Sequence, residues 1–268
     1  ERFARREAMA SRTKSVPRFV GDAPVVVAEG DEIPASAPTL DEIVLTARKY
    51  AQLMHISEED VNDQLVDTLS VYKREWASKW ARKFDNACLG VTSAADGDDG
   101  QPYTSLYRAI SPGAAGANLI TATTALTYAQ LNSALGIVED SSKFDSANTV
   151  WMAHPKMLKE IRGMVKGNAD LVLPDPLAGT PGTLFGYPLV ISYGAATSAA
   201  ASASPAGNPL LIVGNRQMLI NGVRGGVESV LSRDAEFARD GVVLKTRIRR
   251  GFAVADADAF AIVERVGA

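Results

Sequence analysis

The chain has 268 residues, of which 46% are hydrophobic and 22% are charged, and its formal net charge is −3. These values are ordinary for a globular protein, and the length is enough to bury the core of one large domain or of two modest ones. No apolar run approaches the roughly 20 residues that a membrane-spanning helix needs, and the charge balance argues against a protein that clamps nucleic acid with its whole surface.

Residues 1–23 predict a polar arm. Six basic and two acidic side chains fall within its first twenty residues, so the arm is basic and the net negative charge lies on the rest of the chain. The arm is either a solvated, partly disordered tail or a segment that contacts a partner, and the residues leave both readings open. The chain begins at Glu1 instead of Met, which suggests either proteolytic removal of an N-terminal segment or a disordered start that this numbering leaves out.

Residues 24–56 predict an extended β-hairpin with a polar tip and a second strand of unusual length. Residues 40–56 contain neither Gly nor Pro, and they alternate in the period-2 manner of a strand. At about 3.3 Å per residue this strand would reach about 55 Å, whereas an ordinary strand covers about 17–20 Å. A domain of this size cannot cover such a hairpin, so we expect it to project and to lie on another copy of the chain.

Residues 57–89 predict a long helix. Ser57 is suited to its N-cap, with Asp60 three residues on, and Gly90 is suited to its C-terminal stop. At about 1.5 Å per residue the helix would be about 50 Å long, and the four-residue steps of its apolar stripe predict a curved axis. The apolar stripe consists of Val61, Leu65, Leu69, Tyr72, Trp76, Trp80 and Phe84.

Charge is segregated along this helix, with the acidic side chains concentrated in its first half. This arrangement complements the helix dipole, and the basic half would equally suit an acidic partner, so the two explanations are compatible. We expect Cys88, one turn after Phe84, to be a buried apolar residue. The basic residues of the second half are Lys73, Arg74, Lys79, Arg82 and Lys83.

The middle of the chain predicts turns followed by an α/β region. Residues 91–124 are rich in turn formers, and DGDDG at 96–100 lacks the ligands that a calcium loop requires. Beyond them we expect a helix from Thr127, a buried strand around Trp151 and a helix that begins at Pro155. Residues 194–209 are small and polar, and they predict a flexible exposed loop.

Residues 242–266 predict closing strands, the first of them half-buried. Its apolar side chains and its basic side chains point to opposite faces. The apolar face carries Val242, Leu244, Thr246 and Ile248, and the other carries Val243, Lys245, Arg247 and Arg249.

No catalytic, cofactor-binding or metal-binding motif stands out. The chain has no phosphate-binding or dinucleotide-binding glycine loop, and GVRGG at 222–226 has the wrong spacing and predicts a turn. One cysteine and two histidines show no spacing typical of a zinc site. We therefore expect no enzyme activity, no cofactor and no metal.

Taken in order, several segments resemble the major capsid protein of tailed double-stranded DNA bacteriophages, which has the Hong Kong 97-type fold. AEGDEIP at 28–34, followed by LDEIVLTARKYAQLMHIS, is similar to the family's extended loop. The helix that ends in KFDNACLGV at 83–91 is similar to its spine helix. NTVWMAHPKMLKEIR and LFGYPLVIS resemble parts of its central domain, and LKTRIRRGFAVADADAFAIV resembles its closing strands.

The resemblance implies an α+β fold divided into five parts. These are an N-terminal arm (1–23), an extended hairpin loop (24–56), a peripheral domain with the spine helix (57–124), an α/β axial domain (125–233) and closing strands of the peripheral domain (234–268). It also implies a virion protein, assembled in the cytoplasm of a bacterial host, whose hexamers and pentamers form an icosahedral shell. The shell would enclose double-stranded DNA without reading its sequence, with scaffold, portal, maturation protease and decoration protein as further partners.

One departure from the family concerns covalent links. The name-giving member joins a hairpin lysine to an asparagine of a neighbouring subunit. Residues 30–39 contain no lysine and residues 234–268 contain no asparagine. We therefore expect a shell that holds together without such links.

We expect the acidic hairpin tip to lie over basic residues of a neighbouring copy. Opposite charges would set register and rate more than affinity, and the apolar side of the hairpin would supply most of the binding energy. The alternatives are an encapsulin-type nanocompartment shell with the same fold and a soluble α/β enzyme. The tip acids are Glu29, Asp31 and Glu32, and the candidate basic partners are either Lys73, Arg74, Lys79, Arg82 and Lys83 or Lys245, Arg247 and Arg249.

Overall fold

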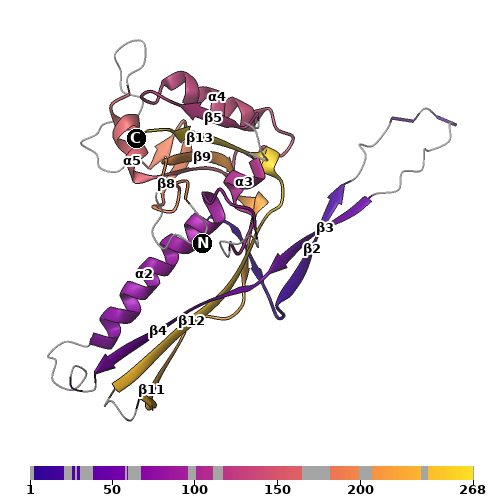
Figure 1. Ribbon diagram of the computed structural model, residues 1–268. Helices are drawn as coiled ribbons and strands as arrows, with labels where there is room; N and C mark the ends of the chain where they lie inside the picture. Colours follow the sequence, from indigo (N-terminus) through magenta and orange to yellow (C-terminus); the bar gives the residue numbers. More distant parts are fainter. Residues whose placement is uncertain are drawn as a thin grey trace.

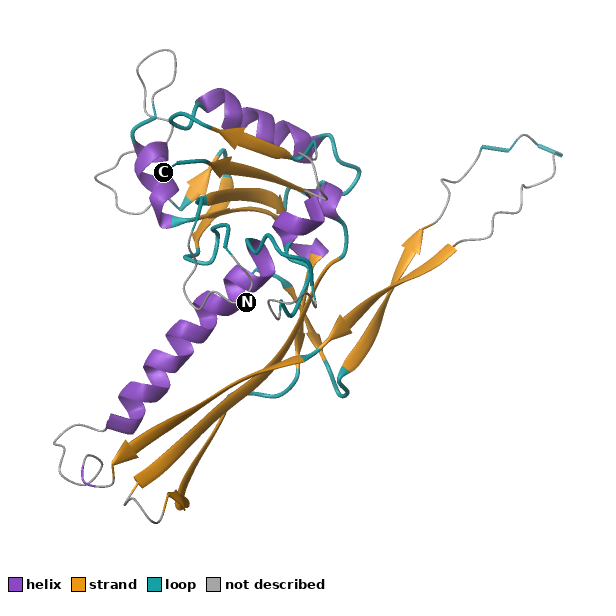
Figure 2. Cartoon of the chain, in the orientation of Figure 1, coloured by secondary structure: helices purple, strands orange, loops and turns teal. Residues whose placement is uncertain are grey.

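The computed structural model describes residues 3–20, 26–27, 29–30, 39–57, 59, 68–95, 101–110, 117–164, 182–198, 207–236 and 241–267. Figures 1 and 2 show an upper part in which helices lie against a sheet, and two long extensions that diverge from it. One extension combines a helix with long strands, and the other is a two-stranded hairpin. The fold is of the α+β class, as predicted.

The long strand β12 (Gly241–Val254) organises a five-stranded sheet. Its first part lies between β4 (Arg48–Ser57) and β11 (Glu228–Glu236), and its last residues pair with β10 (Leu219–Val223). These pairings are antiparallel, and β1 (Arg5–Ala8) adds to β10 in parallel. Segments from both ends of the chain therefore meet in one sheet.

Burial alternates along β12 from Leu244 to Arg249, as its sequence predicts, whereas Val243, which was expected on the basic side, is buried as well. Val242, Leu244, Thr246 and Ile248 are buried, whereas Lys245 is exposed. Because successive side chains of a strand point to opposite faces, the basic residues share one face of the sheet.

The upper part contains a six-stranded mixed sheet. Helices α4 (Tyr128–Glu139) and α5 (Pro155–Arg162) pack with one face of it in a core that includes Trp151 and Val213. The opposite face, with Ile212, packs into a second core. In order across the sheet, the strands are β5 (Leu119–Ala122), β13 (Phe260–Arg265), β9 (Leu210–Asn215), β6 (Thr149–Ala153), β8 (Tyr187–Ile191) and β7 (Thr183–Leu184).

The second core joins the two sheets. It contains Phe84 of α2 (Thr68–Leu89), Leu106 of α3 (Leu106–Ile110) and Phe252 of β12, together with Ile212 and Ile262 of the six-stranded sheet. The two sheets and the end of α2 are thereby packed around one continuous apolar cluster. Two short 3-10 helices, η2 (Arg216–Met218) and η4 (Ala257–Ala259), lead into β10 and β13.

Local sequence signals correctly predicted where the helices α4 and α5 of the upper part begin. Thr127 caps α4 in a capping box with Gln130, and Pro155 is the first residue of α5. Trp151 is fully buried, as predicted for its strand.

The long helix differs from its prediction at its start. Ser57, the predicted N-cap, is the last residue of β4 and pairs with Gly241 of β12. Ser57 is thus paired across the sheet, although local capping preferences predicted that it would begin the helix. Trp76, Phe84 and Cys88 are buried, as predicted.

The hairpin also differs from its prediction. Its outgoing strand is β2 (Thr13–Val20), inside the segment predicted as a polar arm, and it pairs with β3 (Thr39–Thr46). Three of the basic residues that made this segment resemble a tail, Arg5, Lys14 and Arg18, contact acidic side chains and carbonyl groups. The predicted long strand is divided at Ala47, on either side of which β3 and β4 join different sheets.

Sheet membership crosses the expected domain boundaries. β10 and most of β11 fall within the predicted axial segment 125–233, yet they pair with β12. β5 and β13 fall in the predicted peripheral segments, yet they belong to the six-stranded sheet. The two predicted closing strands therefore do not pair with each other, because η4 redirects the chain between them.

The predicted exposed loop at 194–209 is partly buried. Ala195 and Ala196 are inaccessible, and Asn86 of α2 donates hydrogen bonds through Nδ2 to the carbonyls of Ala196 (2.7 Å) and Gly194 (3.2 Å). Small side chains here serve close packing against the end of α2. The DGDDG segment at 96–100 lies outside the described residues.

Candidate functional site

The base of the projecting hairpin rests on a small apolar core. Val16 of β2 and Leu45 of β3 are buried there with Met9 and Ile220. Further along β3, on the opposite side, Val44 is 55% exposed. Figure 1 shows β2 and β3 extending away from the rest of the molecule.

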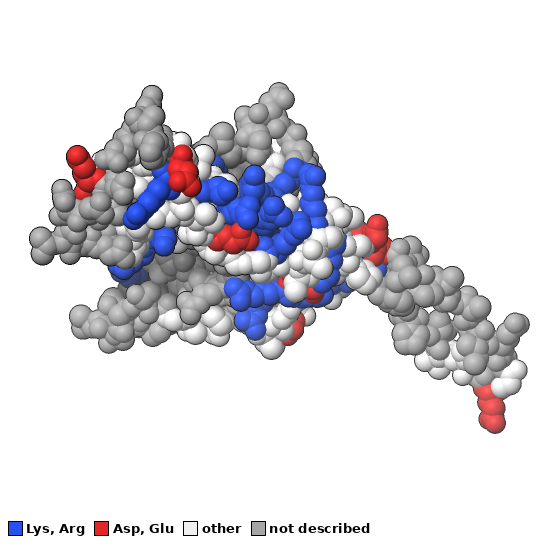
Figure 3. Space-filling model, turned by 90° about the horizontal axis from the view of Figure 1, so that it is seen from below, with Lys and Arg blue, Asp and Glu red and all other residues white. Residues whose placement is uncertain are grey.

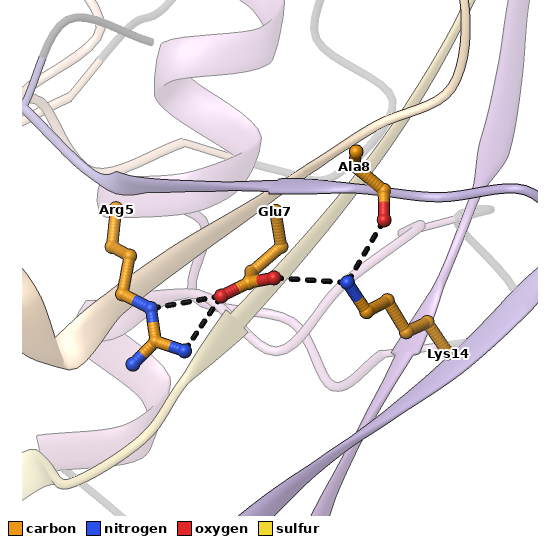
Figure 4. A network of polar contacts seen from close by, with 4 residues as sticks. All are labelled: Arg5, Glu7, Ala8 and Lys14. Atoms are coloured by element: carbon orange, nitrogen blue, oxygen red, sulfur yellow. Dashed lines mark hydrogen bonds and ion pairs between the residues drawn. The ribbon is translucent and has the colours of Figure 1, made fainter.

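Glu7 ties β1 to the base of the hairpin (Figure 4). Its Oε1 accepts hydrogen bonds from Arg5 Nε (2.9 Å) and Nη2 (2.6 Å), and its Oε2 accepts one from Lys14 Nζ (2.9 Å). Lys14 Nζ also donates to the carbonyl of Ala8 at 2.9 Å. The hydrogen bonds from Lys14 and from Arg5 lower the pKa of Glu7 below its usual value.

Arg18 of β2 connects the hairpin to the turn before β13. Its Nη1 donates to the carbonyl of Ala255 at 2.7 Å and lies 3.9 Å from the Asp256 carboxylate. Its Nε lies 3.5 Å from the carboxylate of Asp41 on β3. Such partly exposed ion pairs contribute only about 0–1 kcal/mol each, so their main effect is to orient the hairpin.

The chain passes from one sheet to the other at Ala47. The amide of Ala47 donates to the carbonyl of Arg12 at 2.7 Å, while Arg48 begins the pairing with β12. Gly251 of β12 lies beneath this crossing, and a Cβ there would be only 3.2 Å from the carbonyl oxygen of Thr46. The absence of a side chain lets the strands cross closely.

Aromatic contacts connect α2 to the long sheet. Tyr50 of β4 meets Trp80 and Phe84 edge-on, with ring centroids 6.4 and 6.2 Å apart. Phe84 in turn meets Tyr103, whose hydroxyl donates to the carbonyl of Arg250 at 2.5 Å. Burial raises the pKa of both tyrosine hydroxyls, so both remain protonated. Because Tyr50 contacts Trp80 and Phe84 of α2, the face of the sheet that carries Tyr50 is the one turned toward α2.

The face turned away from α2 is basic. The register places Lys245 between Val230 of β11 and Leu53 of β4, and it places Arg249 opposite Lys49. Val230 and Leu53 are 50% and 58% exposed. Figure 3 shows Lys and Arg side chains gathered on the side seen from below, with few acidic side chains between them. We call the surface made by Lys49, Leu53, Arg224, Val230, Lys245, Arg247 and Arg249 the basic face.

The predicted basic residues of α2 are partly engaged within the chain. Lys79 pairs with Glu75 at 2.7 Å, and the Arg82 guanidinium lies 4.7 Å from the ring centroid of Tyr193. Exposed positions of the helix carry Lys73 and Arg74.

A groove of about 530 Å³ separates α2 from β4. Lys79 and Lys83 border it together with Tyr50, Trp76 and Trp80. Two of the five predicted basic residues of α2, Lys79 and Lys83, therefore border an aromatic groove, in contrast to the open basic face.

The hairpin tip is described only in part. Glu29 is exposed and is followed by Gly30 at φ +91°, whereas Asp31 and Glu32 lie outside the described residues. Contact between the tip and either basic group stays a prediction. The sequence reading missed Lys49 and Arg224 as members of the basic face, because their position follows from strand register.

Among the described residues, no group of three or more His, Cys, Asp or Glu side chains could hold a metal ion. None of the helices in the described part is long and apolar enough to cross a membrane.

Comparison with known proteins identifies similar chains. A family model described as the phage capsid family matches residues 2–264, whereas no curated protein matches significantly. A chain from Mycobacterium phage Bobi is 16% identical with a TM-score of 0.76, and the match covers 100% of this chain and 90% of that one. A chain from Microbacterium phage Oxtober96 is 20% identical with a TM-score of 0.70, covering 98% and 90%. A structure described as the capsid of a native GTA particle is 18% identical with a TM-score of 0.72, covering 99% and 89%.

Proposed function

This chain belongs to the phage capsid family, and from that premise we propose that its projecting hairpin joins neighbouring copies into a closed shell. The protein is a major capsid protein, a structural component of the virion, with the Hong Kong 97-type fold. The comparisons support neither an encapsulin-type compartment nor a soluble enzyme.

The observation that carries the proposal is the projection of the hairpin. Its base is buried in the chain's own core, while β2 and β3 extend away from the rest of the molecule (Figure 1). An extended pair of strands gains little stability without cover, and a second copy of the chain supplies that cover in an assembly.

The proposed assembly is an icosahedral shell of hexamers and pentamers around double-stranded DNA, built in the bacterial cytoplasm. Each subunit of this shell is divided into three parts: the hairpin, a peripheral part that contains α2, and an axial part that contains α4 and α5. Scaffold, portal, maturation protease and decoration protein are proposed partners. Cohesion is noncovalent, because the tip segment 30–39 contains no lysine.

Charge is proposed to guide the hairpin onto its neighbour. Glu29, with Asp31 and Glu32, would approach the basic residues of α2 or those of β12. Burial of exposed apolar side chains such as Val44 and Leu53 would supply most of the affinity.

A truncated hairpin tests the proposal. Residues 17–42 are replaced by Asn-Gly, which joins the paired residues Val16 and Ile43 and keeps the buried base. We expect wild-type protein to form shells in negative-stain micrographs and the truncated protein to remain as small oligomers or monomers with a cooperative melting transition. Normal shells from the truncated protein, or monomeric wild-type protein at high concentration, would contradict the proposal.

A further inference from the structure

Two arginines of the basic face have no partner within the described part of the chain. Neither the Arg224 nor the Arg249 side chain makes a hydrogen bond or ion pair there. Both line a pocket of about 190 Å³, together with Arg247 and the turn Gly225–Gly226. Three arginine residues therefore line one small space.

The pocket is held in shape by its surroundings. Glu228 accepts from Arg247 Nε (2.7 Å) and Nη2 (2.6 Å), which fixes that guanidinium at the rim. The amide of Arg224 donates to the carbonyl of Arg249 at 3.4 Å, and Arg250 Nη1 donates to the carbonyl of Gly225 at 2.9 Å. The turn and the strand beneath it are thus joined directly.

The described residues that line this pocket carry more positive than negative charge. Among the described residues that line it, Glu228 is the one acidic side chain, against three arginines. Guanidinium groups bind carboxylates and phosphates through paired hydrogen bonds, and like charges held together without a counterion repel each other. An oxyanion is therefore the chemistry that the pocket fits.

We propose that the Arg224–Arg247–Arg249 pocket is an oxyanion site that receives a carboxylate from the hairpin tip of a second copy. This inference rests on the proposed function and names the receiving residues, among them Arg224, which the sequence reading did not include. The occupant is a protein segment because exposed Val230 and Leu53 flank Lys245 on the same face. Apolar side chains beside the cations suit a strand with acidic and apolar residues better than a phosphate backbone.

The structure also favours this pocket over the basic residues of α2. On α2, Lys79 is already paired with Glu75 and the Arg82 guanidinium lies over the Tyr193 ring, while Lys73 and Arg74 stand at exposed positions of the helix. On the basic face, Arg224 and Arg249 remain available within the described residues. A carboxylate can therefore bind Arg224 and Arg249 without breaking an ion pair that either side chain makes among the described residues.

Charge reversal tests the site. The variant Arg224→Glu/Arg249→Glu is compared with Lys73→Glu/Arg74→Glu, which makes the same change of charge at exposed positions of α2. Assembly of the full chain is followed by light scattering at low salt and checked by electron microscopy. We expect the pocket variant to assemble roughly tenfold more slowly or worse, and the α2 variant to assemble nearly as the wild type.

The tip supplies the complementary change. Glu29→Lys/Asp31→Lys/Glu32→Lys should slow assembly alone and restore it when combined with the pocket variant. Rescue of the α2 variant instead would place the tip on α2 and overturn the inference, as would normal assembly of the pocket variant. Rescue by neither combination would likewise contradict it.

Two controls keep the outcomes separate. Thermal unfolding establishes that each variant is folded, and Arg224→Gln/Arg249→Gln, which adds no negative charge, should show a smaller defect of the same direction. If wild-type protein forms no shells, the proposed function fails. If wild-type shells form and the pocket variants match them, only the oxyanion site fails.

Discussion

Gly90, which follows α2 directly, lies so close to Ala196 that a Cβ at Gly90 would be 2.1 Å from the carbonyl oxygen of Ala196. The backbone also joins here, since the amide of Ser198 donates to the carbonyl of Gly90 at 3.4 Å. The end of the long helix and the segment before β9 are therefore packed backbone against backbone. A side chain between them would separate the helix from the six-stranded sheet.

Gly90→Ala should lower the free energy of unfolding by about 1–3 kcal/mol, the usual cost of overpacking. Gly136→Ala in α4 is the matched control, because nothing lies within 4 Å of its added Cβ. That variant should be neutral or stabilising by up to about 1 kcal/mol, since alanine favours the helix. Denaturant unfolding of both subunits gives the comparison, and equal effects would contradict the close packing at Gly90.

Tyr103→Phe should destabilise the junction between α2 and β12. It removes the buried hydroxyl that donates to the carbonyl of Arg250, and the expected loss is about 1–2 kcal/mol. Tyr128→Phe, at a position of α4 that is 42% exposed, should leave the unfolding free energy nearly unchanged. An unchanged Tyr103→Phe protein would mean that this hydrogen bond adds nothing to stability.

Sequence patterns were sufficient where local chemistry determines structure. The alternate positions Val242, Leu244, Thr246 and Ile248 are buried as predicted, although Val243 is buried as well, and Thr127 and Pro155 marked the starts of two helices. A projecting hairpin was also predicted, although the long strand behind that prediction is divided at Ala47 and its second half, β4, pairs with β12 of the same chain.

Long-range pairing was not predictable in the same way. Strand β2 contains Pro17 and the charged Lys14 and Arg18, so it resembles a solvated tail until its partners on β1, β3 and the β13 turn are known. The basic face has the same origin, since Arg224 and Arg249 meet only through the register of β10 and β12. The division at Ala47 carries no Gly or Pro signal of its own.

Purified shells should dissociate completely into single chains in a denaturing gel without reducing agent. The tip segment 30–39 has no lysine and residues 234–268 have no asparagine, so the lysine–asparagine link has no partners there. Bands at multiples of the 28.4 kDa chain after boiling in detergent would contradict noncovalent cohesion.

His154 should make the stability of the subunit depend on pH. Its Nδ1 accepts the amide of Lys156 at the start of α5, and its ring meets Tyr193 edge-on, with Arg82 stacked on that tyrosine. Burial, followed by the charge of Lys156, lowers the pKa of His154 below its usual 6.5. The unfolded chain therefore takes up the proton first, so this stability is complete above pH 6.5 and is lost as the pH falls below it.

His154→Asn isolates that contribution. Asparagine caps a helix without titrating, so the variant should lose less stability than the wild type between pH 7.5 and pH 5.5. Denaturant midpoints across this range provide the measurement. Parallel pH profiles for the two proteins would show that another group is responsible.

Glu7 should make the stability of the hairpin base depend on pH, and in a lower pH range than His154. The hydrogen bonds from Lys14 and Arg5 lower its pKa below 4.5, so its contribution is present above pH 4.5 and is lost as the pH falls through the pKa of the folded state. Glu7→Gln weakens the same network at neutral pH. Because the ion pairs are partly exposed, we expect amide exchange at Met9 and Ala47 to rise only about threefold.

Glu42→Gln is the control for this experiment. Glu42 lies on β3 and accepts a hydrogen bond from Ser15 at 2.6 Å, away from β1. The amide of Met9, which donates to the carbonyl of Val223, should keep its wild-type exchange rate in this variant. If Glu7→Gln and Glu42→Gln have the same effect on that amide, the Arg5–Glu7–Lys14 network does not hold β1 against the hairpin base.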